Sequence, residues 1–417
     1  MRISIWGLLG AGRLSAKSRK KLGIVGFLYF IEGSLPAILW EVLPVYFRVQ
    51  GVSLRDIGGL RLLELPYSLK FFWSPLVHRF GDRRLWITVC MLAIAIVVGI
   101  LPFVSVARLD LIAIIILALT TLSATQDIAI DSYTVGLTQR EEEGPVNGVR
   151  ASAYRMALVM LGGGMVFLAA VFRWPLLYIA AAIVLAVLGF FVVFVPRLDL
   201  PEAARQHWLS GFVGWIGTWK AVPLVVFVLT YKMGEFAIGP MVKPFWVDYG
   251  SLIWADRGEL MFQIGLIPTT FGIVLSVAGA LSGGAFISRY GIFHGIWVLG
   301  LFQAVSNLGY ALVAWADLGR FGLYGASVFE SFSGGLGTAA FLAFLMNICE
   351  KEHATTQYAF LSSVFSLTGR LVGGVSGLGA ERFGYGNYFA LTFLLALPAY
   401  LLLPWVKRWI HEGGRGG

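Results

Sequence analysis

Long apolar runs alternate with short polar breaks along almost the whole chain. About 20 mostly apolar residues cross the hydrocarbon core of a bilayer as a helix, and runs of this kind predict membrane spans. Twelve spans are predicted, over residues 22–47, 57–77, 85–104, 109–135, 149–171, 175–195, 222–247, 260–287, 293–315, 321–348, 357–378 and 387–406. The pattern therefore predicts an all-α integral membrane protein.

The chain divides near its middle. The longest stretch outside the spans, 196–220, contains Pro196, Pro201 and several charges, which is typical of a linker. We predict a basic tail (1–21), a six-helix bundle (22–195), the linker (196–220), a second six-helix bundle (221–406) and a second tail (407–417).

Similar turns recur at the same place in both halves, HRFGDRR at 78–84 and SRYG at 288–291. A parallel repeat of two six-helix halves resembles the major-facilitator plan, with a substrate site near the midplane.

Basic residues in alternate loops set the predicted orientation. One side of the membrane collects most of them: the N-terminal tail, Arg79, Arg83, Arg84, Arg140, Arg197, Arg205, Lys220, Arg289, Lys351, Lys407, Arg408 and Arg415. Both termini are therefore expected in the cytoplasm.

Composition excludes several classes of protein. Hydrophobic residues make up 58% of the 417 residues and charged residues 13%, so a soluble enzyme is excluded. The formal charge of +9 is spread over loops and tails, and we expect no nucleic-acid partner. Cys90 and Cys349 form no ligand pattern, and the chain has no HExxH, Walker A or GxSxG motif. We expect no metal, no cofactor and no enzymatic activity, and transport driven by a gradient.

Ionisable residues inside spans are the candidates for chemistry, because each costs about 2.5–3.5 kcal/mol at a helix centre. Asp127 and Asp131 are four residues apart and so share one helix face. Either could carry a proton, or could form a structural ion pair with an arginine. We favour the proton role for Asp127, and for Asp131 a structural pair with Arg79 or Arg83.

Three further charged residues leave alternatives open. Lys232 and Glu235 are three residues apart and could simply pair with each other. Alternatively, Lys232 could meet an anionic substrate or Asp127, with Glu235 as a second proton acceptor. Arg155 could neutralise the acids of the fourth span or bind a substrate carboxylate or phosphate.

Several motifs resemble one known family. They are LPYSLKFFWSPL (65–76), ATQDIAID (124–131), NGVRASAYRMAL (147–158), YKMGE (231–235), SNLGY (306–310), FESFSGGLGTAAF (329–341) and ATTQYAFLSS (354–363). In this order they resemble the AmpG muropeptide permeases, whose wider group includes acetyl-CoA transporters and siderophore permeases.

The resemblance implies proton-coupled import of 1,6-anhydro-muropeptides across the bacterial inner membrane by a monomer. It also implies a transport role for the paired acids Asp127 and Asp131. The chain departs from the family in its twelve predicted spans, since many relatives have more, and in His78, where an aspartate is usual. FLYFIEG (27–33) also resembles the siderophore-uptake branch. A siderophore, an acetyl-CoA-like thioester or another amphipathic solute is therefore the alternative cargo, and a non-transporting membrane sensor the alternative class.

The candidate residues follow from these arguments. Proton coupling is assigned to Asp127, Asp131 and Glu235. Substrate binding is assigned to Lys232, Arg155, Glu32, Glu64, Lys70, Gln126, Tyr154 and Gln357, and conformational change to the loop residues Arg79, Gly81 and Arg83.

Overall fold

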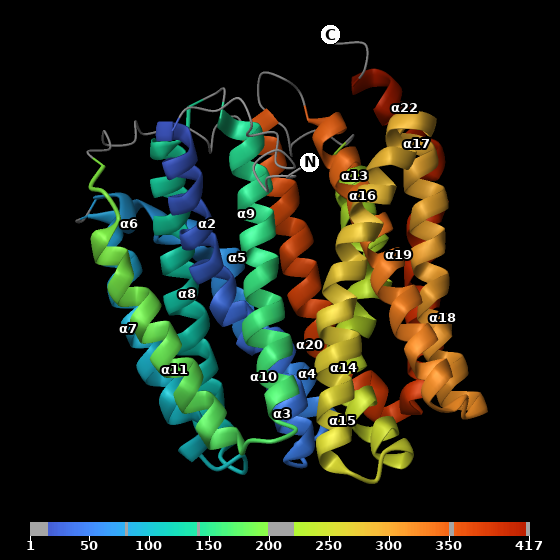
Figure 1. The fold of residues 1–417 in the computed structure, drawn as a ribbon. Coiled ribbons are helices and arrows are strands. Elements are labelled where there is room, and N and C mark those ends of the chain that lie inside the picture. Colours follow the sequence, from blue (N-terminus) through green and yellow to red (C-terminus); the bar gives the residue numbers. More distant parts are fainter. Residues whose placement is uncertain (1–15, 80–81, 140–141, 199–220, 350–353, 414–417) are drawn as a thin grey trace, which may run out of the picture. The chain divides into compact units, whose positions relative to one another are not determined.

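The computed structural model describes residues 16–79, 82–139, 142–198, 221–349 and 354–413 (Figure 1). Most of the predicted linker and of the basic N-terminal tail lies outside these ranges. Every regular element within them is a helix, so the predicted all-α fold class is confirmed. Nine of the described helices are long and apolar enough to cross a membrane, and a pair bent by 51° near Leu402 raises this number to ten.

The helices that precede the linker include several short pieces. They are α2 (Ala16–Pro36), η2 (Ala37–Val42), α3 (Leu43–Val49), α4 (Leu54–Leu60), η3 (Arg61–Glu64), α5 (Leu65–Leu69), η4 (Lys70–Phe72), α6 (Ser74–Arg79), α7 (Arg83–Ile100), η5 (Leu101–Phe103), α8 (Leu109–Leu137), α9 (Glu143–Ala157), η7 (Leu158–Gly163), α10 (Gly164–Leu168), α11 (Trp174–Phe191) and η8 (Val192–Phe194).

The longest of the described helices follow the linker. The helices after the linker are α13 (Ala221–Tyr231), α14 (Met233–Ile253), α15 (Arg257–Ile264), η9 (Gly265–Phe271), α16 (Gly272–Tyr290), α17 (Ile292–His294), η10 (Gly295–Leu299), α18 (Gly300–Ala316), α19 (Gly319–Ile348), α20 (Ala354–Ala396), α21 (Pro398–Leu401) and α22 (Leu403–Gly413).

Each predicted span has a helical counterpart, but several of them differ from a single straight helix. The second predicted span is divided into α4, η3, α5, η4 and α6. The eleventh span and the start of the twelfth lie together in α20, where Gly384 turns the chain with φ 72°. Glycine adopts this left-handed conformation without the steric penalty that other residues incur.

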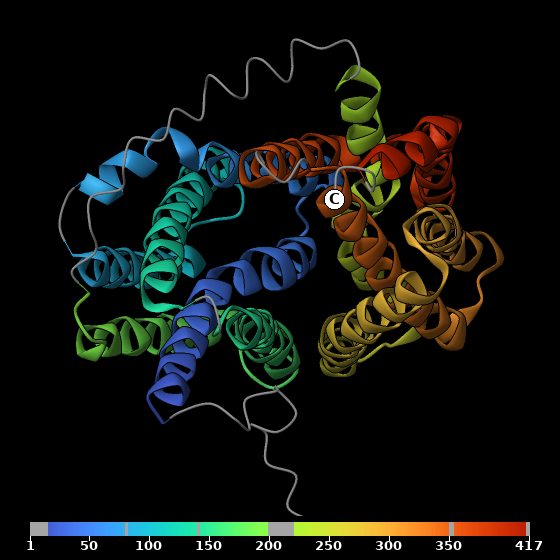
Figure 2. The ribbon, with the colours of Figure 1, turned by 90° about the horizontal axis from the view of Figure 1, so that it is seen from above.

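The chain forms two compact units. Unit 1 consists of Met1–Tyr46 and Leu63–Ala204, and in it α2 packs on α8 and α9, and α7 on α8 and α11. A β-carbon at Gly33 of α2 would lie 2.7 Å from the Tyr154 carbonyl oxygen of α9, so only glycine permits this close approach. Figure 2 shows many of the helices nearly end-on.

Unit 2 consists of Phe47–Leu62 and Arg205–Gly417. Its helices α16 and α19 cross closely, because a β-carbon at Gly279 or at Gly335 would overlap a backbone carbonyl of the other helix. The apolar core beside this crossing includes Phe227, Phe341 and Phe344, all fully buried.

The segment Phe47–Leu62 precedes the linker in sequence but packs within unit 2. Helix α4 lies against α20, where Gly58 meets the backbone of Gly377. The Arg48 Nε donates to Asp248 Oδ1 at 2.7 Å, and the Tyr385 hydroxyl donates to Asp248 Oδ2 at 2.7 Å. We call these residues the 47–62 segment below.

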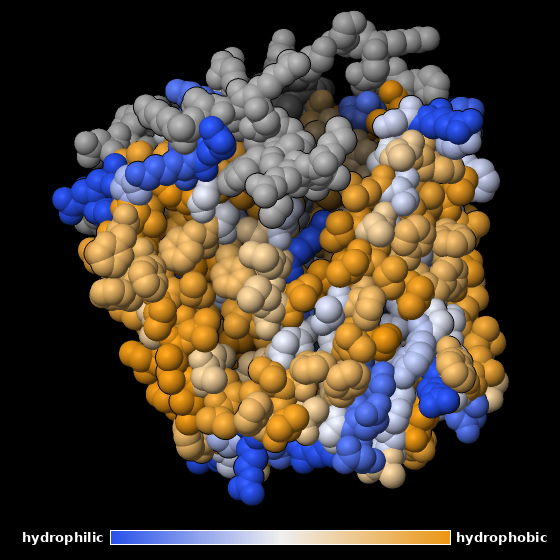
Figure 3. All heavy atoms as spheres, viewed as in Figure 1, coloured by the Kyte–Doolittle hydropathy of each residue, from blue (hydrophilic) through white to orange (hydrophobic). Residues whose placement is uncertain are grey.

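Large apolar side chains cover much of the outer surface seen in Figure 3. Ile96, Val171, Leu281 and Leu401 are between 64% and 79% exposed. Exposed apolar area of this extent is typical of a lipid-facing surface.

Candidate functional site

The candidate site in unit 1 is built from three helices and one short helical turn. Helix α2 supplies Tyr29 and Glu32, which are three residues apart on one face. Helix α8 supplies Asp127 and Asp131, four residues apart, and η4 contributes Lys70. Arg150 comes from α9. We call these six side chains the carboxylate cluster.

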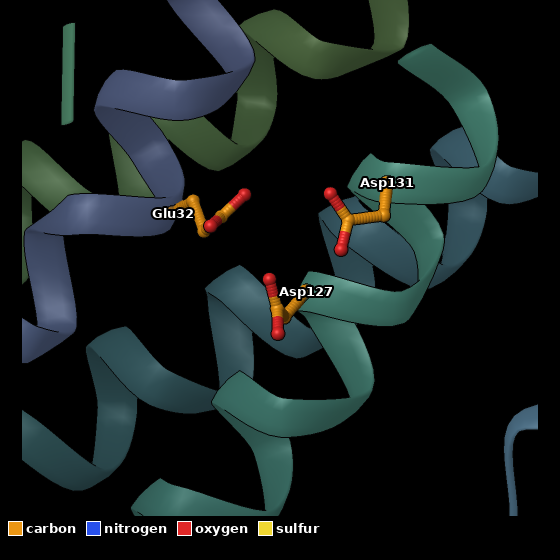
Figure 4. Close-up of side chains that lie close together, drawn as sticks. All are labelled: Glu32, Asp127 and Asp131. Atoms are coloured by element: carbon orange, nitrogen blue, oxygen red, sulfur yellow. The ribbon is translucent and has the colours of Figure 1, made fainter. Parts of the chain in front are cut away.

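The three acids of the carboxylate cluster lie together. One carboxylate oxygen from each of Glu32, Asp127 and Asp131 lies within 4.8 Å of the others, and Figure 4 shows the three groups facing a common space. Glu32 Oε2 is buried and has no hydrogen-bond partner among the described residues. Like charges this close repel strongly, because little water separates them.

Two bases balance part of this charge. Lys70 Nζ forms an ion pair with Asp127 and lies 3.8 Å from Asp131 Oδ2. The Arg150 guanidinium donates to Asp131 Oδ1 at 2.9 Å and also lies 4.4 Å from the centre of the Tyr29 ring. The Tyr29 hydroxyl donates to the same Asp131 oxygen at 2.5 Å. Asp131 is therefore held by two helices, whereas Asp127 depends on Lys70 alone among the ion pairs described.

The structure gives Asp131 an arginine partner, as one of the two alternatives expected, but a different arginine. Arg150 takes the place proposed for Arg79 or Arg83, and Arg83 Nε instead lies 3.5 Å from Ser132 Oγ. Arg155 is half-buried on α9 and forms none of the ion pairs of the cluster.

The remaining substrate-binding candidates of the first half differ in how they relate to the cluster. Tyr154 on α9 is close enough to Glu32, Asp127 and Glu64 to interact with them electrostatically, and Glu64 is buried. Gln126 is 1% exposed and its Nε2 lies 3.4 Å from Met91 Sδ, so it packs between α7 and α8. Gly81 and the side chain of Gln357 lie outside the described residues.

A second polar cluster lies in unit 2. Lys232 is 1% exposed and forms an ion pair with Glu235, which matches the simpler alternative of mutual pairing. Lys232 Nζ also donates to Gln303 Oε1 at 3.1 Å and to Thr338 Oγ1 at 2.8 Å. In this structure the lysine charge is enclosed by protein groups.

Asp82 lies beside the loop candidates, and sequence reasoning did not select it. Asp82 caps α7 by accepting from the Arg84 N–H at 3.0 Å, and its carboxylate also accepts from the Arg84 guanidinium and from Arg197 Nε at 3.1 Å. The Arg84 hydrogen bonds outweigh partial burial and hold the Asp82 pKa at about 2. Arg79 is the last residue of α6.

Tyr29 and Arg150 were also missed as members of the site. Tyr29 precedes Glu32 by three residues on a helix, which is a usable signal. The choice of Arg150 over Arg155 depends on how α9 is rotated against α8, and no local pattern encodes this rotation.

Comparison with known proteins agrees with this architecture. A profile of the Major Facilitator Superfamily matches residues 22–369. The chain is 26% identical to "Putative transporter AmpG 4" of Rickettsia felis, over 92% of this chain and 96% of that protein. It is 27% identical to "Anhydromuropeptide permease" of Escherichia coli K12, over 91% of this chain and 78% of that protein.

Solved structures show the same fold at low sequence identity. The nucleoside transporter NupG superimposes with a TM-score of 0.73 at 16% identity, over 94% of this chain and 98% of that one. A bacterial homologue of the human lysosomal transporter Spinster gives 0.76 at 11% identity, over 96% and 98%.

Proposed function

Because the chain belongs to the Major Facilitator Superfamily and is a transporter rather than an enzyme, we propose that it imports 1,6-anhydro-muropeptides together with protons. The name of the Escherichia coli relative supports the cargo. The carboxylate cluster supports the proton as the coupling ion. We also propose that the protein acts as a monomer in the bacterial inner membrane. In this proposal both termini lie in the cytoplasm, as the distribution of basic residues favours.

One observation carries the proton proposal: in the contacts described, the carboxylate cluster holds three acids and two bases. Glu32, Asp127 and Asp131 face Lys70 and Arg150. With all groups ionised, the cluster has one excess negative charge, and a single proton neutralises it. Uncompensated charge inside a membrane protein is costly, so the cluster gains from binding a proton.

The acids of α2 and α8 have different roles in proton binding. Asp131 keeps two partners besides Lys70, which favours a structural role for it. Glu32 has an unpartnered buried oxygen and faces Asp127, so the proton is shared between these two carboxyls. When the proton leaves, Lys70 is the cation closest to the uncovered charge.

Uptake into proteoliposomes tests this function. Purified protein with labelled anhydro-disaccharide peptide should accumulate the label when an inward proton gradient is imposed. A sodium gradient at constant pH should give no accumulation. Accumulation that follows sodium and ignores pH would assign the three carboxylates to a metal cation instead.

Two further arms make the assignment specific. The isosteric Asp127→Asn variant should lose proton-driven accumulation at least tenfold, because an amide cannot release the shared proton. The same substitution on the same helix, Asp110→Asn, should retain uptake, since Asp110 is exposed in the first turn of α8 and pairs with Arg108 outside the cluster. Unchanged accumulation by Asp127→Asn would contradict the proton role, and preferred uptake of a siderophore or a coenzyme A thioester would contradict the cargo.

A further inference from the structure

The polar cluster of unit 2 surrounds a break in a helix. Helix α13 ends at Tyr231 and α14 begins at Met233, and Lys232 between them has φ −102° and ψ 7°. No side chain caps the N-terminus of α14. The break places the lysine side chain inside unit 2, where it is 1% exposed.

Two donors converge on one carboxylate oxygen in this cluster. Lys232 Nζ and Gln303 Nε2 both bond to Glu235 Oε2. Lys232 is fixed further by Thr338 Oγ1 at 2.8 Å, and Thr338 in turn donates to the Gly334 carbonyl at 2.7 Å. An ammonium and an amide at one point form a preformed receptor for a carboxylate.

Glycine on α19 makes room for this receptor. A β-carbon at Gly337 would overlap the Gln303 side chain, so a larger residue would push the amide away from the carboxylate. Gly334 leaves space beside Glu235, where a β-carbon would lie 3.7 Å from Oε1. The receptor is therefore shaped by the backbone as well as by its polar groups.

The acid of this cluster is more accessible than the base. The Glu235 side chain is 30% exposed, whereas that of Lys232 is 1% exposed. Glu235 can therefore turn outward without unfolding its surroundings, but Lys232 cannot follow it. A departing Glu235 would leave a buried ammonium that needs another anion.

We propose that Lys232 and Gln303 form a carboxylate-binding subsite, and that Glu235 occupies it until a carboxylate of the cargo takes its place. The ligand class is a carboxylate-bearing peptide, because the exchange replaces one carboxylate by another and leaves the charge of the cluster unchanged. A dianionic phosphate would leave an excess negative charge next to Glu330, which also interacts with Lys232. This subsite rests on the proposed function and adds the part of the cargo that unit 2 recognises.

A matched pair of ligands tests the subsite. One is the anhydro-disaccharide tripeptide with free carboxylates, and the other is the same molecule with every peptide carboxylate converted to an amide. Ligand-induced shifts in thermal unfolding of the purified protein measure binding, and proteoliposome uptake measures transport. Wild-type protein should bind the acid about tenfold more tightly than the amide, as expected for one charged hydrogen bond.

The variants separate recognition from folding. Lys232→Met together with Glu235→Gln removes both charges of the ion pair, so neither partner stays buried without the other. This double variant should unfold near the wild-type temperature and should bind acid and amide equally. Asp127→Asn, in unit 1, should keep the preference for the acid.

Each result then has one meaning. Equal binding of acid and amide by the wild type, or a preference for the acid that survives in the double variant, would overturn the subsite. If uptake fails for both ligands while binding still prefers the acid, the proposed transport function fails and the subsite stands. If uptake follows the proton gradient with no preference, the subsite fails and the function stands.

Discussion

Lys70 is the one cation paired with Asp127 in the part of the chain described. Replacing it by Met should destabilise the protein by up to about 3 kcal/mol, since removing one partner leaves an uncompensated charge. Thermal unfolding in detergent measures this loss.

A second substitution should reverse much of the effect. Lys70→Met combined with Asp127→Asn removes both charges and should regain most of the wild-type unfolding temperature, while proton-driven uptake stays lost. A double variant no more stable than Lys70→Met would show that the ion pair does not explain the stability.

Tyr29 offers a finer test, because its hydroxyl and its ring make different contacts. Tyr29→Phe removes the hydrogen bond to Asp131 but keeps the ring beside the Arg150 guanidinium. We expect a loss of about 1–3 kcal/mol in stability, as for a hydrogen bond to a charged group. Tyr29→Leu should lose more, since the cation–π contact goes as well. Equal unfolding temperatures for the two variants would contradict this division.

Because charge is costly to bury in a membrane, Glu32, Lys70, Asp127 and Asp131 could be predicted as site residues from the sequence. The residues that bind them could not be predicted in this way. Asp131 is bound by Tyr29 and Arg150 from two other helices, and those contacts depend on helix rotation rather than on spacing along one helix.

Among the elements, α7 has a cap whose charge and geometry can be separated. Asp82→Asn keeps an oxygen that accepts from the Arg84 N–H but loses the ion pairs with Arg84 and Arg197. Asp82→Ala loses the cap hydrogen bond as well as the ion pairs. The alanine variant should therefore be about 1 kcal/mol less stable than the asparagine variant, the usual worth of an N-cap. Thermal unfolding at neutral pH compares the two.

The Asp82 pKa of about 2 also fixes the direction of a pH effect. Because the folded-state pKa lies below the ordinary value of about 3.9, the ionised carboxylate stabilises the protein fully above about pH 4. This contribution is lost as pH falls from about 4 to about 2. The difference in unfolding temperature between wild type and Asp82→Asn should therefore shrink over that window and stay constant from about pH 5 to about pH 8.

Hydropathy located the helices of this protein but not their interruptions. The break at Lys232 and the division of the second span into short pieces from α4 to α6 lie inside apolar runs, where the average over a window hides them. Gly384 has a positive φ inside α20, and the sequence around it does not distinguish it from the other glycines of that helix.

On the scale of the whole molecule, the 47–62 segment belongs to unit 2, although the chain on either side of it is assigned to unit 1. Its contacts with the rest of unit 2 include the Arg48–Asp248 ion pair and the bond from Arg55 N to Glu381 Oε2 at 3.2 Å. If transport requires the 47–62 segment to separate from α20, a covalent link between the segment and α20 should stop transport.

Cross-linking tests that requirement. In a background with Cys90 and Cys349 changed to Ser, Arg55→Cys and Glu381→Cys can be joined by a short bifunctional thiol reagent, since both positions are exposed. Uptake should fall at least tenfold after cross-linking and recover when a cleavable reagent is reduced. Each single-cysteine variant treated alike should keep its uptake, and full uptake by the cross-linked protein would show that the segment stays in place.

The same segment bears on how the polypeptide could be divided. A gene cut within residues 196–220 would give two separate chains, and the first would still contain residues 47–62, whose helix α4 packs on α20 of the second. The contact of Gly58 with Gly377 and the ion pair of Arg48 with Asp248 would then hold the two fragments together without a covalent bond. Co-expressed fragments should consequently purify together through a tag on only one of them.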